Sequence, residues 1–168
     1  KTGIQRHYKK IYRQNNLDSS LESVFFTPNQ FSEKRSKHHI LSFSANWLDI
    51  DLKLTKGVVL DFTLESLIYD QVLTAGEQAG LPAPTAIVLS GSGGLHLYWI
   101  YNAVDTTVCS TKKWESVTRK LMSAFNGQRL WFVDYGASIR CSGLMRLPGS
   151  INPKTGKRVV AEYGGPVY

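Results

Sequence analysis

The hexapeptide at residues 47–52, Trp-Leu-Asp-Ile-Asp-Leu, constrains the fold of this chain more than any other stretch. Apolar residues alternate with carboxylates, which predicts a half-buried β-strand because side chains two positions apart share one face. Asp49 and Asp51 then stand side by side, and the apolar residues point into a core. Two ionised carboxylates this close repel each other unless a cation lies between them, and Mg²⁺ characteristically binds one or two carboxylates plus substrate phosphates. Taken alone, the pair also fits an ordinary surface strand with two solvated acids.

Length and composition predict a single globular domain. With 168 residues the chain is long enough to bury a real core. It has no apolar run of membrane-spanning length, no signal peptide at its start and only two cysteines. We therefore expect a cytoplasmic protein with no membrane partner. Because the first residue is Lys rather than Met, we expect residues 1–168 to be one domain excised from a longer protein.

The distribution of charge favours a polyanionic partner. The net charge is +7, and residues 1–56 hold ten Lys or Arg against five acids. Residues 111–168 hold ten against three, whereas residues 57–110 hold none against five acids. Two basic flanks suit nucleic acid or nucleotides. A basic protein without such a partner stays open as the alternative.

Periodicity predicts strands that are interrupted by two long helices. Apolar residues recur at helical spacing over residues 64–79 and 111–125, and a short helix or arm is expected at residues 4–15. Apolar, β-branched and aromatic stretches predict strands at residues 24–26, 85–89, 95–101, 130–133, 144–147 and 159–163. This order predicts an α+β or mixed α/β fold in which the helices cover one face of the sheet.

A glycine-rich turn, Ser-Gly-Ser-Gly-Gly at residues 90–94, leads into the strand that carries His96. Glycines let successive backbone amides approach phosphate oxygens and form an anion-binding nest. A protonated histidine can donate hydrogen bonds from both ring nitrogens. The turn therefore fits a phosphate site, and it fits a plain hairpin equally well.

Two more signals lie near the C-terminus. Asp134 ends an apolar strand, where it can serve as a third metal ligand or cap the next turn. Arg146 and Lys154 flank a Pro-Gly-Ser turn. Both could reach a triphosphate, the arginine as a planar fork and the lysine as a point charge.

The order of these signals resembles the archaeo-eukaryotic primase superfamily and, more narrowly, the primase-polymerases of plasmids, phages and other mobile elements. That order is Asp-x-Asp, a Gly-rich segment leading to His, an apolar strand leading to Asp, and Arg-Leu-Pro-Gly-Ser-x-Asn, and it spans residues 25–154. The resemblance implies an α+β, RRM-like primase-polymerase catalytic core with a mixed or antiparallel sheet and flanking helices. It also implies that the chain is part of a longer DNA replication protein.

The resemblance assigns roles to individual residues. Asp49, Asp51 and Asp134 match the three catalytic acids that hold the metal ions. The residues that match the nucleotide-binding positions are Ser92, Gly94, His96, Arg146 and Lys154. Relatives commonly carry a further arginine where this chain has Gly143, and Arg140 is a candidate to supply that charge.

The hypothesis that follows is a DNA primase or DNA-directed polymerase, a nucleotidyltransferase that initiates or extends primers by two-metal catalysis. Two Mg²⁺ or Mn²⁺ ions, roughly 3.5–4 Å apart, would flank the reacting phosphate. The expected partners are a single-stranded DNA template, a primer strand and nucleoside triphosphates, and a fused or associated helicase is a candidate partner. The alternatives are a non-catalytic replication initiator or single-stranded nucleic-acid-binding module on the same scaffold, and a metal-dependent nuclease. Three acids together with a histidine favour the polymerase.

Overall fold

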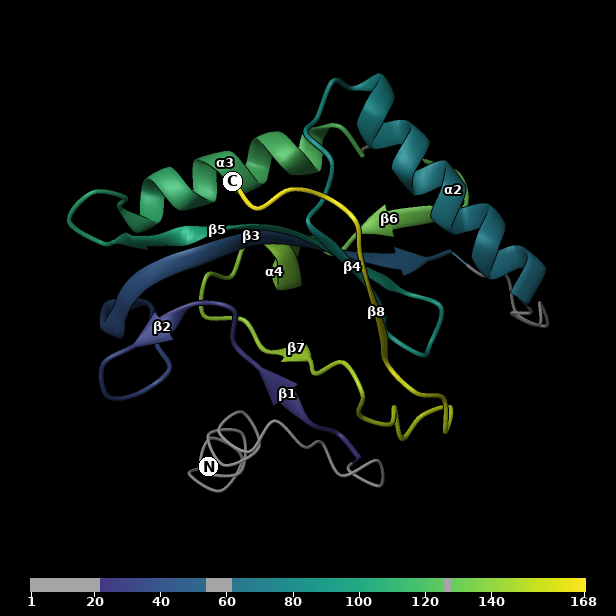
Figure 1. Cartoon of the computed structure of the whole chain (residues 1–168), viewed down its shortest axis with the longest axis horizontal. Coiled ribbons are helices and arrows are strands. Elements are labelled where there is room, and N and C mark those ends of the chain that lie inside the picture. The colour runs from purple at the N-terminus through teal and green to yellow at the C-terminus, as the bar shows by residue number, and fades with distance from the viewer. Residues whose placement is uncertain (1–21, 54–61, 126–127) are drawn as a thin grey trace.

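A curved antiparallel sheet organises the chain (Figure 1). The computed structural model describes residues 22–53, 62–125 and 128–168, without the side chains of residues 62–66, so the arm expected at residues 4–15 lies outside the described residues. Within them, the sheet has six strands in the order β2-β3-β5-β4-β8, and β6 pairs with β3 beside this path. The strands are β2 (Gln30–Phe31), β3 (Ile40–Leu52), β4 (Ala86–Leu89), β5 (Leu95–Asp105), β6 (Trp131–Val133) and β8 (Val160–Tyr163).

At its C-terminal end, the long strand β3 lies between β5 and β6. Asp49 pairs with His96 of β5, and Asp51 pairs with Phe132 of β6, both in antiparallel register. The strand predicted from the alternating hexapeptide is therefore confirmed. It extends over 13 residues rather than six.

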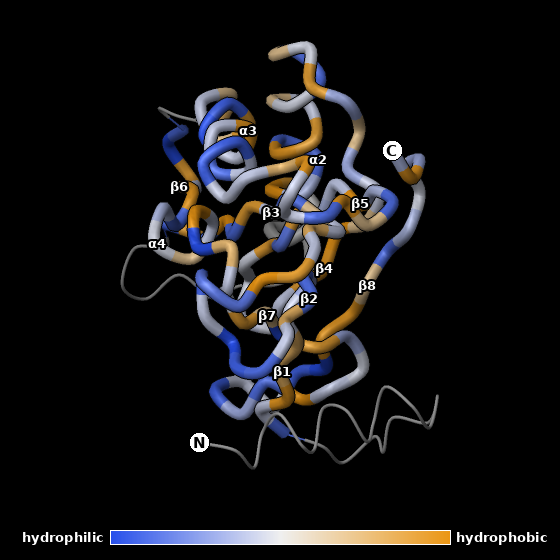
Figure 2. Tube along the Cα trace, turned by 90° about the vertical axis from the view of Figure 1, so that its left-hand side faces the viewer, coloured by the Kyte–Doolittle hydropathy of each residue, from blue (hydrophilic) through white to orange (hydrophobic). Residues whose placement is uncertain are grey.

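Helices cover one face of the sheet, and smaller elements lie on the other. α2 (Phe62–Gln78) and α3 (Thr111–Ser123) lie together above the strands in two perpendicular views (Figures 1 and 2). The opposite side carries a two-stranded antiparallel ribbon of β1 (Phe25–Phe26) and β7 (Met145–Arg146), together with α4 (Tyr135–Ser138). A short 3₁₀ helix, η1 (Lys37–His39), precedes β3. The predicted α+β fold with helices on one face is confirmed.

Alternation along β3 divides its side chains between two cores. Leu48 and Ile50 are fully buried in a cluster with Leu97 and Trp99 of β5 and with apolar residues of α2 and α3. Trp47, on the other face, belongs to a second cluster. That second face is the one from which the two aspartates project, so the acids stand next to a packed core.

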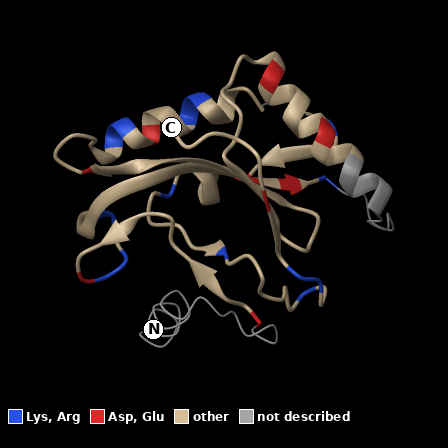
Figure 3. Cartoon of the chain, viewed as in Figure 1, with Lys and Arg blue, Asp and Glu red and all other residues tan. Residues whose placement is uncertain are grey.

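Several features of the fold bear on the expectations from composition. Cys109 and Cys141 are both free thiols. Among the described helices, none is long and apolar enough to cross a bilayer. Acidic residues mark the end of β3, and basic residues mark the segment after β7 on the side of the sheet away from the helices (Figure 3).

Candidate active site

The two aspartates of β3 face a cavity of about 240 Å³ on the sheet face away from α2 and α3. Asp49 and Asp51 are both partly buried, whereas Leu48 and Ile50 on the opposite face are fully buried. The acid pair thus projects as the alternation predicts.

Side chains from five other segments line the same cavity. They come from β1, the β4–β5 turn, β5, the region of β7 and the segment after it. These residues are Phe25, Ser90, Ser92, His96, Leu144, Met145, Arg146 and Lys154. Of the eight candidate residues from the sequence, six line this cavity; Gly94 and Asp134 lie beside it. A Cβ added at Gly94 would stand 3.3 Å from Asp51 Oδ1 and 3.1 Å from the Ile50 carbonyl oxygen, so a larger residue would push this turn and the acid strand apart by a few tenths of an ångström.

The acids carry negative charge that their protein neighbours do not balance. Burial and, to a smaller extent, the charges of Asp51 and Asp134 together raise the pKa of Asp49 to about 7, against the opposing charge of Arg146. Burial and the charge of Asp134 likewise raise the pKa of Asp51, and Lys154 opposes this. Repulsion between clustered carboxylates is the condition that a divalent cation relieves.

His96 lies directly across from Asp49 and is buried. Its Nε2 stands 3.6 Å from Asp49 Oδ1, and its Nδ1 is buried without a hydrogen-bond partner. Burial, and to a smaller extent the charge of Arg146, lowers the pKa of His96 to about 4. The imidazole is therefore neutral near pH 7, and it donates from one nitrogen. The protonated, doubly donating form considered from the sequence is disfavoured.

Asp134 lies at the junction of β6 and α4. Its backbone N–H donates to the Asp49 carbonyl oxygen at 2.8 Å. Its carboxylate accepts a hydrogen bond from the Ala137 N–H at 3.0 Å and caps α4. Of the two roles left open by the sequence, the cap is present. Within residues 22–53, 62–125 and 128–168, no group of three or more His, Cys, Asp or Glu is arranged to hold a metal ion, so the third-ligand role stays a prediction.

Arg146 brings to the cavity a cation with one unsatisfied hydrogen-bond donor. One terminal nitrogen of its guanidinium is buried without a hydrogen-bond partner, and the guanidinium carbon lies 5.2 Å from the centre of the Phe25 ring. Buried donors are nearly always paired in native structures. An anionic ligand would supply the missing acceptor.

The segment after β7 is fastened to the glycine-rich turn by side chains to which the sequence assigned no role. Asn152 is fully buried, and its amide donates to the Ser90 carbonyl oxygen at 2.8 Å. Its side-chain oxygen, Oδ1, accepts from the Lys154 N–H at 3.1 Å. Thr155 Oγ1 donates to the Gly91 carbonyl oxygen at 2.7 Å. The asparagine of Arg-Leu-Pro-Gly-Ser-x-Asn was the available signal, and its burial shows that it fixes the segment carrying Lys154.

The position at which relatives carry a further arginine is closed to side chains. A Cβ on Gly143 would lie 2.9 Å from the Arg140 carbonyl oxygen and 3.3 Å from Trp47 Cζ2. Arg140 itself is exposed and is not among the residues that line the cavity. The structure therefore does not support the replacement of that charge by Arg140.

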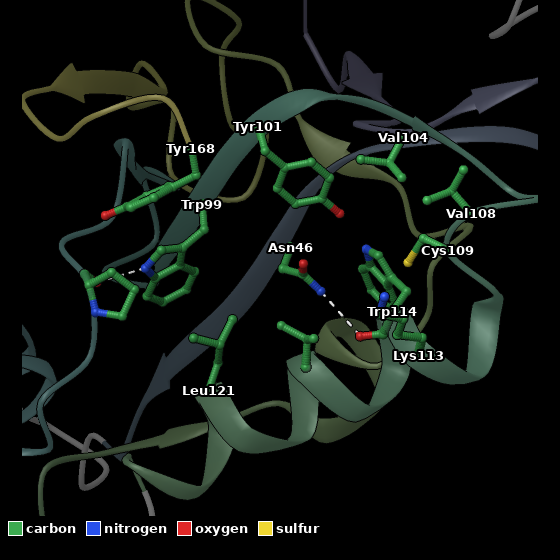
Figure 4. A pocket seen from close by; sticks show the side chains of 12 residues that line it. Asn46, Trp99, Tyr101, Val104, Val108, Cys109, Lys113, Trp114, Leu121 and Tyr168 are labelled. Atoms are coloured by element: carbon green, nitrogen blue, oxygen red, sulfur yellow. Dashed lines mark hydrogen bonds between the residues drawn. The ribbon is translucent and has the colours of Figure 1, made fainter.

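A second cavity, of about 350 Å³, lies on the helical face between α3, β5 and the C-terminal residues (Figure 4). Its lining is mostly apolar and aromatic, with Trp99, Tyr101 and Trp114 prominent and Lys113 as the one charged residue. It lacks the carboxylates of the smaller cavity. The charged chemistry is therefore concentrated on the opposite face of the sheet.

Comparisons with known proteins point to the same fold as the motifs. No protein-family model and no curated protein sequence matches the chain. Its structure is similar to that of the AEP domain of the primase-polymerase (PrimPol) of cyanophage S-2L, with a TM-score of 0.58 and 19% sequence identity. The similarity covers 86% of this chain and 64% of that chain. The chain thus has an archaeo-eukaryotic primase-like fold.

Proposed function

We propose that this chain is a DNA-dependent nucleotidyltransferase, a primase-polymerase domain that initiates or extends primers on a single-stranded template. The observation that carries the proposal is a single cavity lined by two adjacent carboxylates together with a histidine, a lysine and an arginine that has one buried nitrogen without a hydrogen-bond partner. Carboxylates suit metal ions, and the cationic groups suit a triphosphate. The likeness to a primase-polymerase domain supports the same reading at the level of the fold.

The acid cluster fits Mg²⁺ or Mn²⁺. All its donors are carboxylate oxygens, and the charges of Asp51 and Asp134 add to burial in raising the pKa of Asp49, a repulsion that a cation would relieve. Asp49 and Asp51 would hold the metal, with Asp134 as the neighbouring third acid. When bound, the ions would activate the attacking 3′-hydroxyl and offset the charge of the leaving pyrophosphate.

The other cavity residues would bind and orient the nucleotide. Arg146 offers the unsatisfied terminal nitrogen of its guanidinium to a phosphate, and Lys154 adds a second positive charge on the segment anchored by Asn152. Neutral His96 has its Nδ1 free for one further hydrogen bond. Such groups stabilise the charge that develops during phosphoryl transfer. Basic residues outside the cavity would hold the template through its phosphates, which makes binding sensitive to salt.

One observation favours the alternative, a non-catalytic replication initiator or single-strand-binding module. The Asp134 carboxylate is engaged in capping α4, and a protein that only binds nucleic acid has no need of it as a metal ligand. Such a module would bind single-stranded DNA without incorporating nucleotides.

Incubation with primed and unprimed DNA templates, Mn²⁺ and labelled nucleotides separates these functions. We expect the wild type to incorporate nucleotide, and Asp49→Asn and Asp51→Asn to lose roughly 100-fold or more of this activity. Asp105→Asn is the matched control, since this exposed aspartate ends β5 away from the cavity. Shortening of the labelled strand would indicate a nuclease instead. Undiminished incorporation by both cavity variants would refute the assignment.

A further inference from the structure

An exposed aromatic side chain lies beside the acid pair, on the flank opposite His96. Phe132 of β6 pairs directly with Asp51 in antiparallel register. Directly opposed residues of an antiparallel pair project from the same face of a sheet. Phe132 therefore shares the face of Asp51 and is 41% exposed, whereas its neighbour Trp131 points to the other face and is buried in the core.

A second aromatic residue and a cation extend this surface. Tyr135 follows Asp134 at the start of α4 and is 51% exposed. Arg119 belongs to α3 and reaches Tyr135 from the helical side of the sheet: its guanidinium carbon lies 5.3 Å from the centre of the Tyr135 ring, and it donates a hydrogen bond to the Tyr135 hydroxyl. Phe132, Tyr135 and Arg119 are called the β6–α4 surface below.

The acids separate this surface from the groups suited to phosphate. His96 lies across from Asp49 on the β5 side. The backbone of Lys154 is held through Asn152 to Ser90, at the turn between β4 and β5. Phe132 of the β6–α4 surface lies on the other side of β3 from β5. The carboxylates thus stand between an aromatic flank and a flank with neutral His96 and positively charged Lys154, called the cationic flank below.

The geometry of phosphoryl transfer indicates which flank binds the triphosphate and which binds the strand that attacks it. The attacking and leaving oxygens lie roughly in line, so the nucleophile enters from the side opposite the leaving group. If the triphosphate occupies the cationic flank, the strand with the attacking hydroxyl arrives across the aromatic flank. Aromatic rings stack on bases of any sequence, and arginine binds backbone phosphate.

We propose that the β6–α4 surface binds the 3′-terminal nucleotides of the primer strand, with Phe132 stacking on the terminal nucleotide and Arg119 facing the backbone. This inference rests on the proposed function and adds to it a site for the primer. Neither the strand pattern nor the motif residues indicated it, because Phe132 belongs to a short apolar run.

The test is Phe132→Ala in steady-state primer extension. We expect KM for the primed template to rise about tenfold, in keeping with the loss of one stacked base, and KM for the nucleotide to change less than about twofold. Phe132→Tyr keeps the ring and should restore the wild-type value. Tyr163→Ala is the matched control, because Tyr163 is an aromatic residue with 72% exposure on the outermost strand β8.

A second readout does not depend on activity. The Kd for fluorescein-labelled single-stranded DNA, measured by anisotropy without nucleotide, should also weaken about tenfold in Phe132→Ala. Tyr135→Ala tests the same surface should the first variant fold poorly. If the wild type extends primers and both variants keep its KM for primed template and its Kd for DNA, the β6–α4 surface does not bind the primer, and the proposed function stands. If the wild type incorporates no nucleotide, the proposed function fails. The Kd values then decide whether the β6–α4 surface binds single-stranded DNA.

Discussion

Replacing Asp49 with asparagine should stabilise the protein at alkaline pH. Burial and the neighbouring acids raise the pKa of Asp49 from 3.8 to about 7 in the folded state. Because the folded protein holds this proton more tightly than the unfolded chain does, ionisation of the group opposes folding. The stability that it contributes is fully present below pH 3.8, falls as the pH rises, and is lost above pH 7.

The size of this stabilisation follows from the difference between the pKa values of Asp49 in the unfolded and folded states. The rise from 3.8 to about 7 corresponds to a penalty of about 4 kcal/mol at pH 8, where the carboxylate is ionised in both states. At pH 5 the folded state is protonated and the unfolded chain is mostly ionised, so the penalty is about 1.5 kcal/mol. Asparagine does not titrate. The advantage of the variant over the wild type should therefore grow by about 2–3 kcal/mol between pH 5 and pH 8.

Urea unfolding of both proteins at the two pH values, with EDTA present, measures this difference. Asp105→Asn serves as the control and should show no gain at pH 8, since backbone and side-chain hydrogen bonds with Thr107 lower the pKa of Asp105. Adding Mg²⁺ at pH 8 should raise the urea midpoint of the wild type and have less effect on Asp49→Asn. An advantage of Asp49→Asn that is the same at pH 5 and pH 8, or that is absent at pH 8, would refute the reasoning.

Two further predictions concern the close contacts around the cavity. Gly143→Ala should lower the free energy of unfolding by about 1–3 kcal/mol, because its Cβ would meet the Arg140 carbonyl oxygen at 2.9 Å. Urea midpoints measure this loss. Asn152→Ala should cost about 2 kcal/mol, since the Ser90 carbonyl oxygen loses its buried donor. It should also raise KM for the nucleotide in primer extension, because the segment that carries Lys154 loses one of its two side-chain bonds to the turn.

Each of these variants has a control. Gly164→Ala places its methyl group in open space, so its midpoint should match the wild type. Thr155→Ser keeps the hydroxyl that donates to Gly91 and should preserve the nucleotide KM. Wild-type stability of Gly143→Ala would mean that the adjoining backbone yields at little cost. An unchanged nucleotide KM in Asn152→Ala would mean that Lys154 is not positioned through this asparagine.

Local patterns predicted the acid strand and much of the sheet. The alternation around Asp49 and Asp51 depends on a period of two, which any half-buried strand imposes on its sequence. The glycine-rich turn likewise placed His96 on an antiparallel partner strand, since a turn this short leaves little choice of pairing. These features could be predicted because the interactions that produce them lie within a few residues.

Other parts of the site depend on contacts between distant segments. α4 has four residues and includes Gly136, so it shows no helical periodicity, and the sequence left Asp134 with two possible roles. Phe132 reaches the acids only because β6 pairs with β3, across about 80 intervening residues that carry no pairing signal. The low pKa of His96 arises from burial, which the sequence around it does not specify. Tertiary packing determines the role of Asp134, the position of Phe132 and the pKa of His96.

The hydrogen bonds from Asn152 and Thr155 have a consequence for engineering this domain. Surface loops usually tolerate insertions, because few of their backbone groups are committed. Here the carbonyl oxygens of both Ser90 and Gly91 are held by side chains more than 60 residues away. A graft that replaces either loop alone would lose these hydrogen bonds. The hairpin at residues 90–94 and the stretch at residues 152–157 should therefore be exchanged between homologues as a pair.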